Sequence, residues 1–474
     1  MIENTVEPPF IVWDKVIGGD LYDTDVIPDS ISTTSDGELI FIAGRAYDNS
    51  YEYADSDVLY GLMYSDGRDV QEQALTFGTR YSDYGKSVVS EDNDAFYIAG
   101  ITSGHLNNER NQNSYTRFFI SKYSFNLSEV DNNIPHNHEW TKLLGIFPGD
   151  YFYTEIARTS DGSIYLTGQN HEYKPFLSKF DSDGNEQWTK YLIGIGYSKS
   201  ITTSDDGYIY IAGDAYSDMG DENIFWDQDY GGSDLFLSKF DSDGNIEWIR
   251  QQNNFNRQTA SAITTSSDGN IYIAGALAND YFPEPDTSAI YRYDSNGNYL
   301  GFKSIGEEYS YLSGVVAGED GSIYAIANGR EGVLVKFDNH FKKLYSKSFN
   351  EIDDKTISKL TDITIGADGS IYITGRTDNY KGIESGIYGV IIKLTEQELE
   401  IQEDLEKDPV TGQQEFHLDV DGDGKVTALG DGLMVIRKLF GAAFDGDKLT
   451  SKAISDEATR TTQEIHDSIQ SAID

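Results

Sequence analysis

The sequence predicts an all-β fold of seven small antiparallel sheets, a seven-bladed β-propeller, followed by a small α-helical C-terminal domain. An eight-residue motif, DGSIYLTG at 161–168, recurs in seven strict or loose copies. A second motif, FLSKFDSDGNEQWTK at 176–190, alternates with the first. Apolar residues alternate in both, as half-buried strands require, and the DG pairs suit hairpin turns.

Each repeat unit is long enough for one four-stranded sheet. The copies of the first motif end at residues 44, 100, 168, 213, 275, about 327 and 375. The spacing is roughly 45–68 residues, whereas a propeller blade takes about 40–50 and leaves the rest for loops. Sheets this small cannot bury both faces alone, but seven packed radially can.

The fourth unit shows the expected order of strands within a blade. Strand A covers 199–204, strand B 208–213, strand C 234–240 and strand D 246–251. The A–B and C–D connections are short, whereas the B–C connections are long and irregular. In an up-and-down sheet, the B–C loops therefore share one face with the D–A crossovers.

The last sheet is predicted to be closed by the start of the chain. The seventh unit has strands A, B and C, ending with GVIIKL at 389–394, and no D strand follows. The segment FIVWDKVIGG at 10–19 is similar to the D strands of other units. Pairing this segment with the last sheet would join the two ends of the ring and remove an exposed edge.

The two alternating motifs resemble those of the bacterial seven-bladed β-propeller (SBBP-type) repeat family. The resemblance covers residues 10–394. It implies the fold, but it says almost nothing about chemistry, because propellers include lyases, hydrolases, lectins and scaffolds.

Composition excludes several classes of ligand and site. The net charge is −44, which disfavours nucleic acids and anionic membrane surfaces. The chain has no cysteine, which excludes disulfides and thiolate metal sites. No apolar run is long enough to span a membrane. The first residues lack the pattern of a signal peptide, so an extracellular or cell-surface location requires another route or a trimmed chain.

The longer B–C loops are predicted to gather on one rim, which is rich in aromatic rings and carboxylates. Such a rim suits sugars, peptides or cation-bridged ligands, although the loops could also be tolerated surface insertions. The candidate ligand-binding residues are Tyr51, Tyr53, Phe225, Trp226, Tyr230, Tyr281 and Phe282.

No catalytic constellation stands out, so the sequence predicts a protein that is not an enzyme. There is no GxSxG elbow, no P-loop and no cysteine nucleophile. The histidines of HNH at 136–138 are expected in a solvated C–D turn of the second blade. The DSDGN segments at 181–185 and 241–245 are either hairpin turns capped by their own aspartates, which is favoured, or half of a calcium loop.

The C-terminal region carries the clearest site chemistry. Residues 395–415 are expected to form an acidic linker, and 416–474 a calcium-binding domain. The sequence DVDGDGKVT places oxygen ligands at the spacing of an EF-hand loop, with a turn glycine at its sixth position, ahead of a helix. The candidate Ca²⁺ ligands are Asp419, Asp421, Asp423, Lys425 through its carbonyl, Thr427 and Asp431.

This tail resembles dockerin-type modules, which carry a calcium loop followed by a single helix. The resemblance implies a calcium-ordered module and a cohesin-like partner. Gly430 occupies the twelfth loop position, where the family has an acid, and Asp431 comes one residue late. A site with only three acids and an imperfect last ligand is expected to bind weakly, at roughly 10⁻⁴–10⁻³ M.

Together these features predict a secreted or surface-associated calcium-binding propeller. It would act as a binding, adhesion or scaffold module for a surface polysaccharide or a protein partner. The alternative is a propeller enzyme, a polysaccharide lyase or hydrolase, which would need convergent acids or a histidine near the axis.

Overall fold

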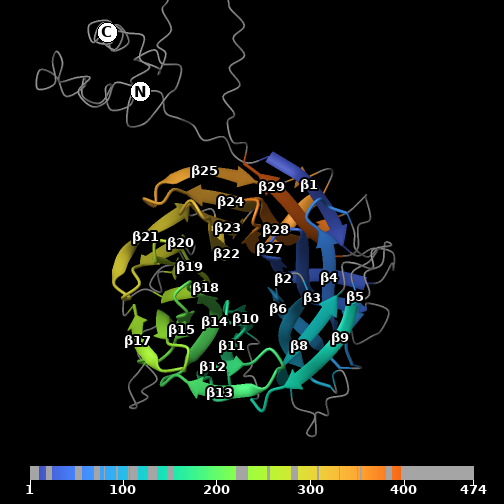
Figure 1. The fold of residues 1–474 in the computed structure, drawn as a ribbon. Coiled ribbons are helices and arrows are strands. Elements are labelled where there is room, and N and C mark those ends of the chain that lie inside the picture. The colour runs from blue at the N-terminus through green and yellow to red at the C-terminus, as the bar shows by residue number, and fades with distance from the viewer. Residues whose placement is uncertain are drawn as a thin grey trace, which may run out of the picture. The chain divides into compact units, whose positions relative to one another are not determined.

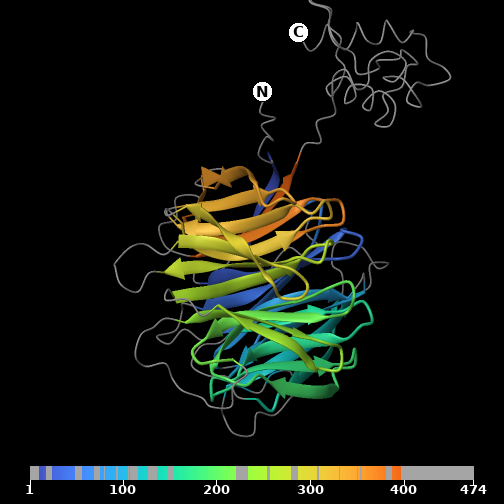
Figure 2. The same ribbon diagram turned by 90° about the vertical axis from the view of Figure 1, so that its left-hand side faces the viewer.

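The computed structural model contains a seven-bladed β-propeller. Seven sheets are arranged around a central axis, and the first strand of each blade lies innermost (Figures 1 and 2). The structure describes residues 10–17, 24–48, 56–68, 75–79, 81–91, 94–104, 106, 116–125, 136–146, 153–219, 233–252, 257–278, 287–306, 309–329, 331–349, 351–352, 355–379 and 387–396.

Each blade is an antiparallel sheet whose strands follow the chain from the inside outwards. The innermost A strands are β2 (Thr24–Thr33), β6 (Asp83–Glu91), β10 (Thr154–Arg158), β14 (Gly196–Thr203), β18 (Arg257–Thr265), β22 (Tyr309–Ala317) and β27 (Lys355–Ile365). The B strands are β3 (Leu39–Asp48), β7 (Ala95–Thr102), β11 (Ile164–Gln169), β15 (Ile209–Ala215), β19 (Ile271–Ala278), β23 (Ile323–Gly329) and β28 (Ile371–Asn379).

The outer half of each blade follows the same order. The C strands are β4 (Ser56–Tyr64), β8 (Arg117–Phe125), β12 (Pro175–Phe180), β16 (Asp234–Phe240), β20 (Thr287–Tyr293), β24 (Gly332–Phe337) and β29 (Tyr388–Thr395). The D strands are β5 (Leu75–Phe77), β9 (His136–Leu143), β13 (Glu186–Tyr191), β17 (Ile246–Gln251), β21 (Tyr299–Gly306), β25 (Lys343–Ser348) and, in blade 7, β1 (Phe10–Ile17).

The N-terminal strand closes the ring, as the sequence predicts. β1 pairs antiparallel with β29, from Phe10 opposite Thr395 to Ile17 opposite Gly389 (Figure 1). The seventh sheet also gains a short extra strand, β26 (Glu351–Ile352), beside β27. The predicted C-terminal helical domain lies outside the described residues, and the domain boundaries at 394 and 415 remain predictions.

Apolar side chains fill the spaces between neighbouring blades. Phe41 in blade 1 stacks on Phe96 in blade 2, with ring centroids 4.9 Å apart. Phe118 in blade 2 meets Phe176 in blade 3 edge-on at 5.3 Å. Burying one such ring contributes about 1.5–3 kcal/mol, so the blades stabilise one another chiefly through these contacts.

The glycine that ends the first motif faces a bulge in the neighbouring A strand in five blades, and blade 6 has Ala327 at the same place. In six blades the A–B register passes over one A-strand residue beside the end of the motif. At Gly213, an added Cβ would lie 1.9 Å from the carbonyl oxygen of Tyr197. Blade 3 has no bulge. There, a Cβ added to Gly168 would lie 3.0 Å from the carbonyl oxygen of Tyr153, so the contact is less close.

Candidate functional site

All thirteen site residues predicted from the sequence lie outside the described residues. These are the rim residues Tyr51, Tyr53, Phe225, Trp226, Tyr230, Tyr281 and Phe282, and the calcium ligands Asp419, Asp421, Asp423, Lys425, Thr427 and Asp431. Within the described part of the chain, no group of three or more His, Asp or Glu side chains could hold a metal ion. The candidate site is therefore built from other residues.

We call the side of the propeller with the A–B and C–D turns the turn face. On this face, the residues of the repeated motifs make contacts between strands and between blades. In six blades the motif tyrosine lies directly opposite a lysine or arginine of the C strand, 4.9–5.7 Å from ring centroid to cation. In blade 1 both partners change together, to Phe41 and Leu62. The tyrosine and the cation thus form one cross-strand unit.

The C-strand lysines also reach the next blade. Lys179 Nζ donates to the carbonyl of Ser242, and Lys393 Nζ to that of Ser65, each at 3.0 Å. Both acceptors lie in the C–D turn of the following blade. The D-strand tryptophans pack beside these turns as well: a Cβ on Gly244 would lie 2.9 Å from the Trp188 ring. The second motif therefore serves to join blades.

The C–D turns of blades 3 and 4 hold themselves together, as favoured in the sequence interpretation. Asp181 Oδ1 accepts the backbone N–H of Asp183 at 3.1 Å and of Asn185 at 2.8 Å. Asp241 makes the same pair of contacts in blade 4. These hydrogen bonds to the ionised form lower the pKa of Asp181, the bond from the Asn185 backbone most of all.

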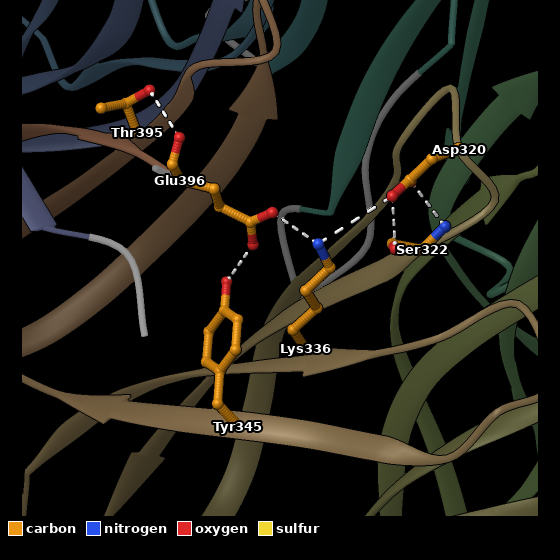
Figure 3. Close-up of polar contacts among 6 residues, drawn as sticks. All are labelled: Asp320, Ser322, Lys336, Tyr345, Thr395 and Glu396. Atoms are coloured by element: carbon orange, nitrogen blue, oxygen red, sulfur yellow. Dashed lines mark hydrogen bonds and ion pairs between the residues drawn. The ribbon is translucent and has the colours of Figure 1, made fainter. Parts of the chain in front are cut away.

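Blade 7 has no C–D turn, and Glu396 takes its place (Figure 3). Its carboxylate accepts from Lys336 Nζ at 2.6 Å and from the Tyr345 hydroxyl at 2.5 Å, both in blade 6. The Lys336 side chain is only 6% exposed and also lies 3.9 Å from Asp320. Burial, and then the hydrogen bond to Glu396, raise the pKa of Tyr345.

A second set of inter-blade hydrogen bonds surrounds the axis. In five blades, an A-strand side chain accepts a backbone N–H from the next A strand: Ser30 from Val88, Ser87 from Ile156, Glu155 from Ile201, Ser200 from Ile263, and Asp362 from Ile31. Two acceptors are therefore carboxyl groups where blades 1, 2 and 4 have serine. Burial raises the pKa of Glu155 to about 8 and that of Asp362 to about 6.

We call the opposite side the loop face, and over blades 3 and 4 it carries four tyrosines that touch one another. The Tyr197 ring is central, with centroids 6.0 Å from Tyr153, 6.1 Å from Tyr173 and 5.2 Å from Tyr216. Tyr153 is 37% exposed, and the other three are partly exposed. We call these four residues the tyrosine platform. The Lys199 Nζ lies 5.1 Å from the Tyr153 ring centroid.

Backbone hydrogen bonds hold the platform in place. The Gly196 N–H donates to the Tyr173 carbonyl, and the Tyr216 N–H to the Ile195 carbonyl, both at 2.8 Å. These bonds tie the crossover between blades 3 and 4 to the B–C loop of blade 3 and to the end of β15. A backbone fixed in this way need not be ordered when a ligand binds, which lowers the entropic cost of binding.

Tyr173 occupies a backbone position that usually requires glycine. Its φ of 61° lies in the left-handed region, where twelve glycines of the described chain also lie. The other non-glycine residue described there is Phe341, which is buried against Phe337. Tyr173 instead is partly exposed on the loop face. Left-handed backbone in a non-glycine residue costs roughly 1–3 kcal/mol and is concentrated at functional sites.

The sequence interpretation missed the platform because it looked only at the long insertions. Tyr84, Tyr153, Tyr197 and Tyr311 occupy equivalent places near the start of their A strands, each one residue before the residue that pairs with the end of the first motif. Aligning the residues that precede each first motif would have revealed this repetition. The structure also corrects the HNH segment: residues 136–143 form β9, because hairpin pairing continues to His136 opposite Phe125.

Comparisons with known proteins find no family for this chain. No protein-family model matches the chain, and no curated protein does. Among solved structures, Chaetomium thermophilum Sqt1 bound to the N-terminus of ribosomal protein L10 has a TM-score of 0.45 at 9% identity, covering 78% of this chain and 96% of that one. YCF48 bound to D1 peptide has a TM-score of 0.45 at 11% identity, covering 81% and 95%. Neither likeness bears on what this chain binds.

One finding concerns membranes. In the part of the chain that the structure describes, no helix is long and apolar enough to cross a bilayer.

Proposed function

We propose that this protein is a binding module whose loop face takes a polysaccharide. The tyrosine platform carries the proposal. Tyrosine rings that are at least partly exposed present flat apolar faces with polar hydroxyl edges, which suit the faces and hydroxyl groups of sugar rings. The strained backbone of Tyr173 supports a role beyond packing, because such strain is concentrated at functional sites.

Ring removal tests the platform. The Tyr153→Ala variant should weaken binding to polysaccharide about threefold to tenfold, through loss of one stacking contact. Isothermal titration with polygalacturonate and dextran measures the change. Tyr299→Ala is the matched control. Tyr299 is also exposed, at 44%, but it adjoins a C–D turn and therefore lies on the turn face, away from the platform. Equal losses in the two variants, or no loss for Tyr153→Ala, would contradict the proposal, and binding of peptides alone would favour a protein partner.

We further propose binding without catalysis. Glu155 and Asp362 are two described acids of the innermost strands with raised pKa values, and each already accepts a backbone N–H from the next blade. This structural use favours a binder over the alternative lyase or hydrolase. Incubation with acidic polysaccharides should release no new reducing ends or unsaturated uronates. Release of product that Glu155→Gln abolishes would establish an enzyme.

The calcium module belongs to the same proposal and is supported by its sequence. We propose that Asp419, Asp421 and Asp423 bind Ca²⁺ with Lys425, Thr427 and Asp431, and that the ion orders a dockerin-like tail outside the cell. The propeller would then belong to the bacterial SBBP-type repeats. Calorimetry should show a Ca²⁺ affinity of roughly 10⁻⁴–10⁻³ M that Asp421→Ala removes. Pull-down with a cohesin-like protein, with and without chelator, tests docking.

A further inference from the structure

Two copies of the first motif are followed by arginine. Arg45 follows Gly44 in blade 1, and Arg376 follows Gly375 in blade 7, so the two lie in blades that are neighbours in the ring. Both stand at the loop-face ends of their B strands. We call Arg45, Lys86, Lys359 and Arg376 the basic cluster.

Two of these cations share one carboxylate. Arg45 Nε lies 3.0 Å from Asp29 Oδ2, and its Nη2 donates to Asp29 Oδ1 at 3.1 Å. Lys86 Nζ lies 3.9 Å from the same Oδ2. Arg45 Nη1 also donates to the Tyr47 hydroxyl at 3.2 Å. Among the described residues, one carboxylate, that of Asp29, therefore serves both cations on this side of the cluster.

The other two cations oppose each other. Lys359 in β27 lies directly across from Arg376 in β28, and like charges in that position destabilise a sheet. Among the described residues, the buried Nε of Arg376 has no hydrogen-bond partner. Burial, followed by the charge of Arg376, lowers the pKa of Lys359. Burial also lowers the pKa of Lys86, with Arg45 and Lys359 adding to the shift.

Tyrosine rings border the cluster on both sides. Lys359 Nζ lies 5.4 Å from the centroid of Tyr311, which is 37% exposed. Lys86 Nζ and the Arg45 guanidinium lie 5.7 and 5.8 Å from the Tyr84 ring. Tyr84 and Tyr311 occupy the strand positions that Tyr153 and Tyr197 occupy in the platform. The same ring of positions thus presents aromatic faces beside Lys199, which is paired with Asp214, on one side of the axis, and aromatic faces beside the basic cluster on the other.

We propose that the basic cluster is an anion-binding subsite that takes the carboxylate or sulfate groups of an acidic polysaccharide. The protein carries a net charge of −44, so a polyanion approaching it needs a local region of positive charge. Guanidinium groups match the geometry of oxyanions, and the surrounding tyrosines accept the sugar rings. This proposal rests on the proposed function, polysaccharide binding by the loop face, and it specifies in addition that the polysaccharide is negatively charged.

The double variant Lys359→Gln/Arg376→Gln tests the subsite in the full-length protein. Titrations use polygalacturonate for carboxylate, dextran sulfate for sulfate, and dextran as the neutral polymer. The wild type should bind at least one of the two polyanions about tenfold more tightly than dextran, because charge-assisted hydrogen bonds add to stacking. The variant should lose this preference and keep its affinity for dextran.

Stability separates loss of the subsite from loss of the fold. Removing two opposed like charges should leave the melting temperature without ligand equal to or above that of the wild type. Lys303→Gln is the matched control, because Lys303 is an exposed cation of β21. An unchanged preference in the double variant, an equal loss in the control, or tighter binding of polyglutamate than of either polyanion would overturn the proposal.

The subsite and the platform fail in different ways. If Tyr153→Ala has no effect but the double variant loses polyanions, the anion subsite stands without the platform. If the wild type binds dextran as tightly as the two polyanions, and only Tyr153→Ala weakens this binding, the platform stands and the anion subsite is wrong.

Discussion

The two faces of the propeller use the same repeats in different ways. On the turn face, the motif tyrosine, the C-strand cation and the turn glycine are occupied by contacts that recur from blade to blade. On the loop face, the equivalent strand ends carry tyrosine, lysine, threonine or isoleucine, and the blades differ. The uniform face builds the ring, so the capacity to recognise a ligand is concentrated where the repeats diverge.

Removing the closing strand β1 should have the largest effect on stability. It would show how far the stability of the ring depends on the pairing of β1 with β29. Deletion of residues 1–17 exposes one edge of β29 and uncovers the contacts of Ile17, Val16 and Ile11. The expected loss of unfolding free energy is roughly 3–6 kcal/mol, measured by chemical denaturation. A truncated protein with unchanged melting behaviour would mean that closure by β1 contributes nothing.

The motif glycines allow a matched comparison between blades. Gly213→Ala brings a methyl group against the Tyr197 carbonyl and should cost about 2–3 kcal/mol. Gly168→Ala, in the blade without a bulge, meets the Tyr153 carbonyl at 3.0 Å and should cost clearly less. Thermal denaturation of both variants measures the difference. Equal costs would show that the bulge is not the reason for glycine.

Glu155 should make stability depend on pH. Its pKa rises from an ordinary 4.5 to about 8 in the folded protein, mainly through burial. The stabilisation from its protonated form is therefore complete below pH 4.5 and is lost as the pH rises to about 8. Glu155→Gln keeps an acceptor for the Ile201 N–H and should be more stable than the wild type at pH 8, by about 1–3 kcal/mol.

The control for Glu155 is the pH profile itself. At pH 4 the wild type and Glu155→Gln should unfold at nearly the same denaturant concentration, and the two curves should separate as the pH rises. A constant difference at every pH would assign the effect of the substitution to packing.

Glu396→Gln should have the smallest effect of the four. The amide retains an acceptor for Tyr345, and Lys336 keeps the Tyr324 ring 4.9 Å away and Asp320 at 3.9 Å. The expected loss is below about 1 kcal/mol. Calorimetric melting measures it, with Lys303→Gln as a surface control. A loss larger than that of Gly213→Ala would make Glu396 a second closing element of the ring.

Local patterns were enough to locate the strands. In the fourth unit, the expected strand at 234–240 coincides with β16 and the one at 246–251 with β17. The alternation of apolar residues and the DG turns are short-range features, so residues close in sequence decide them. Closure by the N-terminus was also predictable, because a blade without a D strand and an unpaired D-like segment complete each other.

Contacts across the ring could not be read from the repeats. The bulge positions depend on how neighbouring strands align, and Glu155 replaces serine in the one blade that lacks a bulge. Lys359, Arg45 and Lys86 are distant in sequence and belong to three different blades. They come together because seven twisted sheets must close at a fixed angle, which sets the distances between strand ends.

The sequence by itself therefore determined the number of blades, the order of their strands and the strand that closes the ring, because these follow from periodicity and hairpin turns. The tertiary structure alone decided which side chains meet on the loop face, including the tyrosine platform and the basic cluster. These side-chain contacts depend on how the blades pack against one another, and that packing is a property of the whole ring.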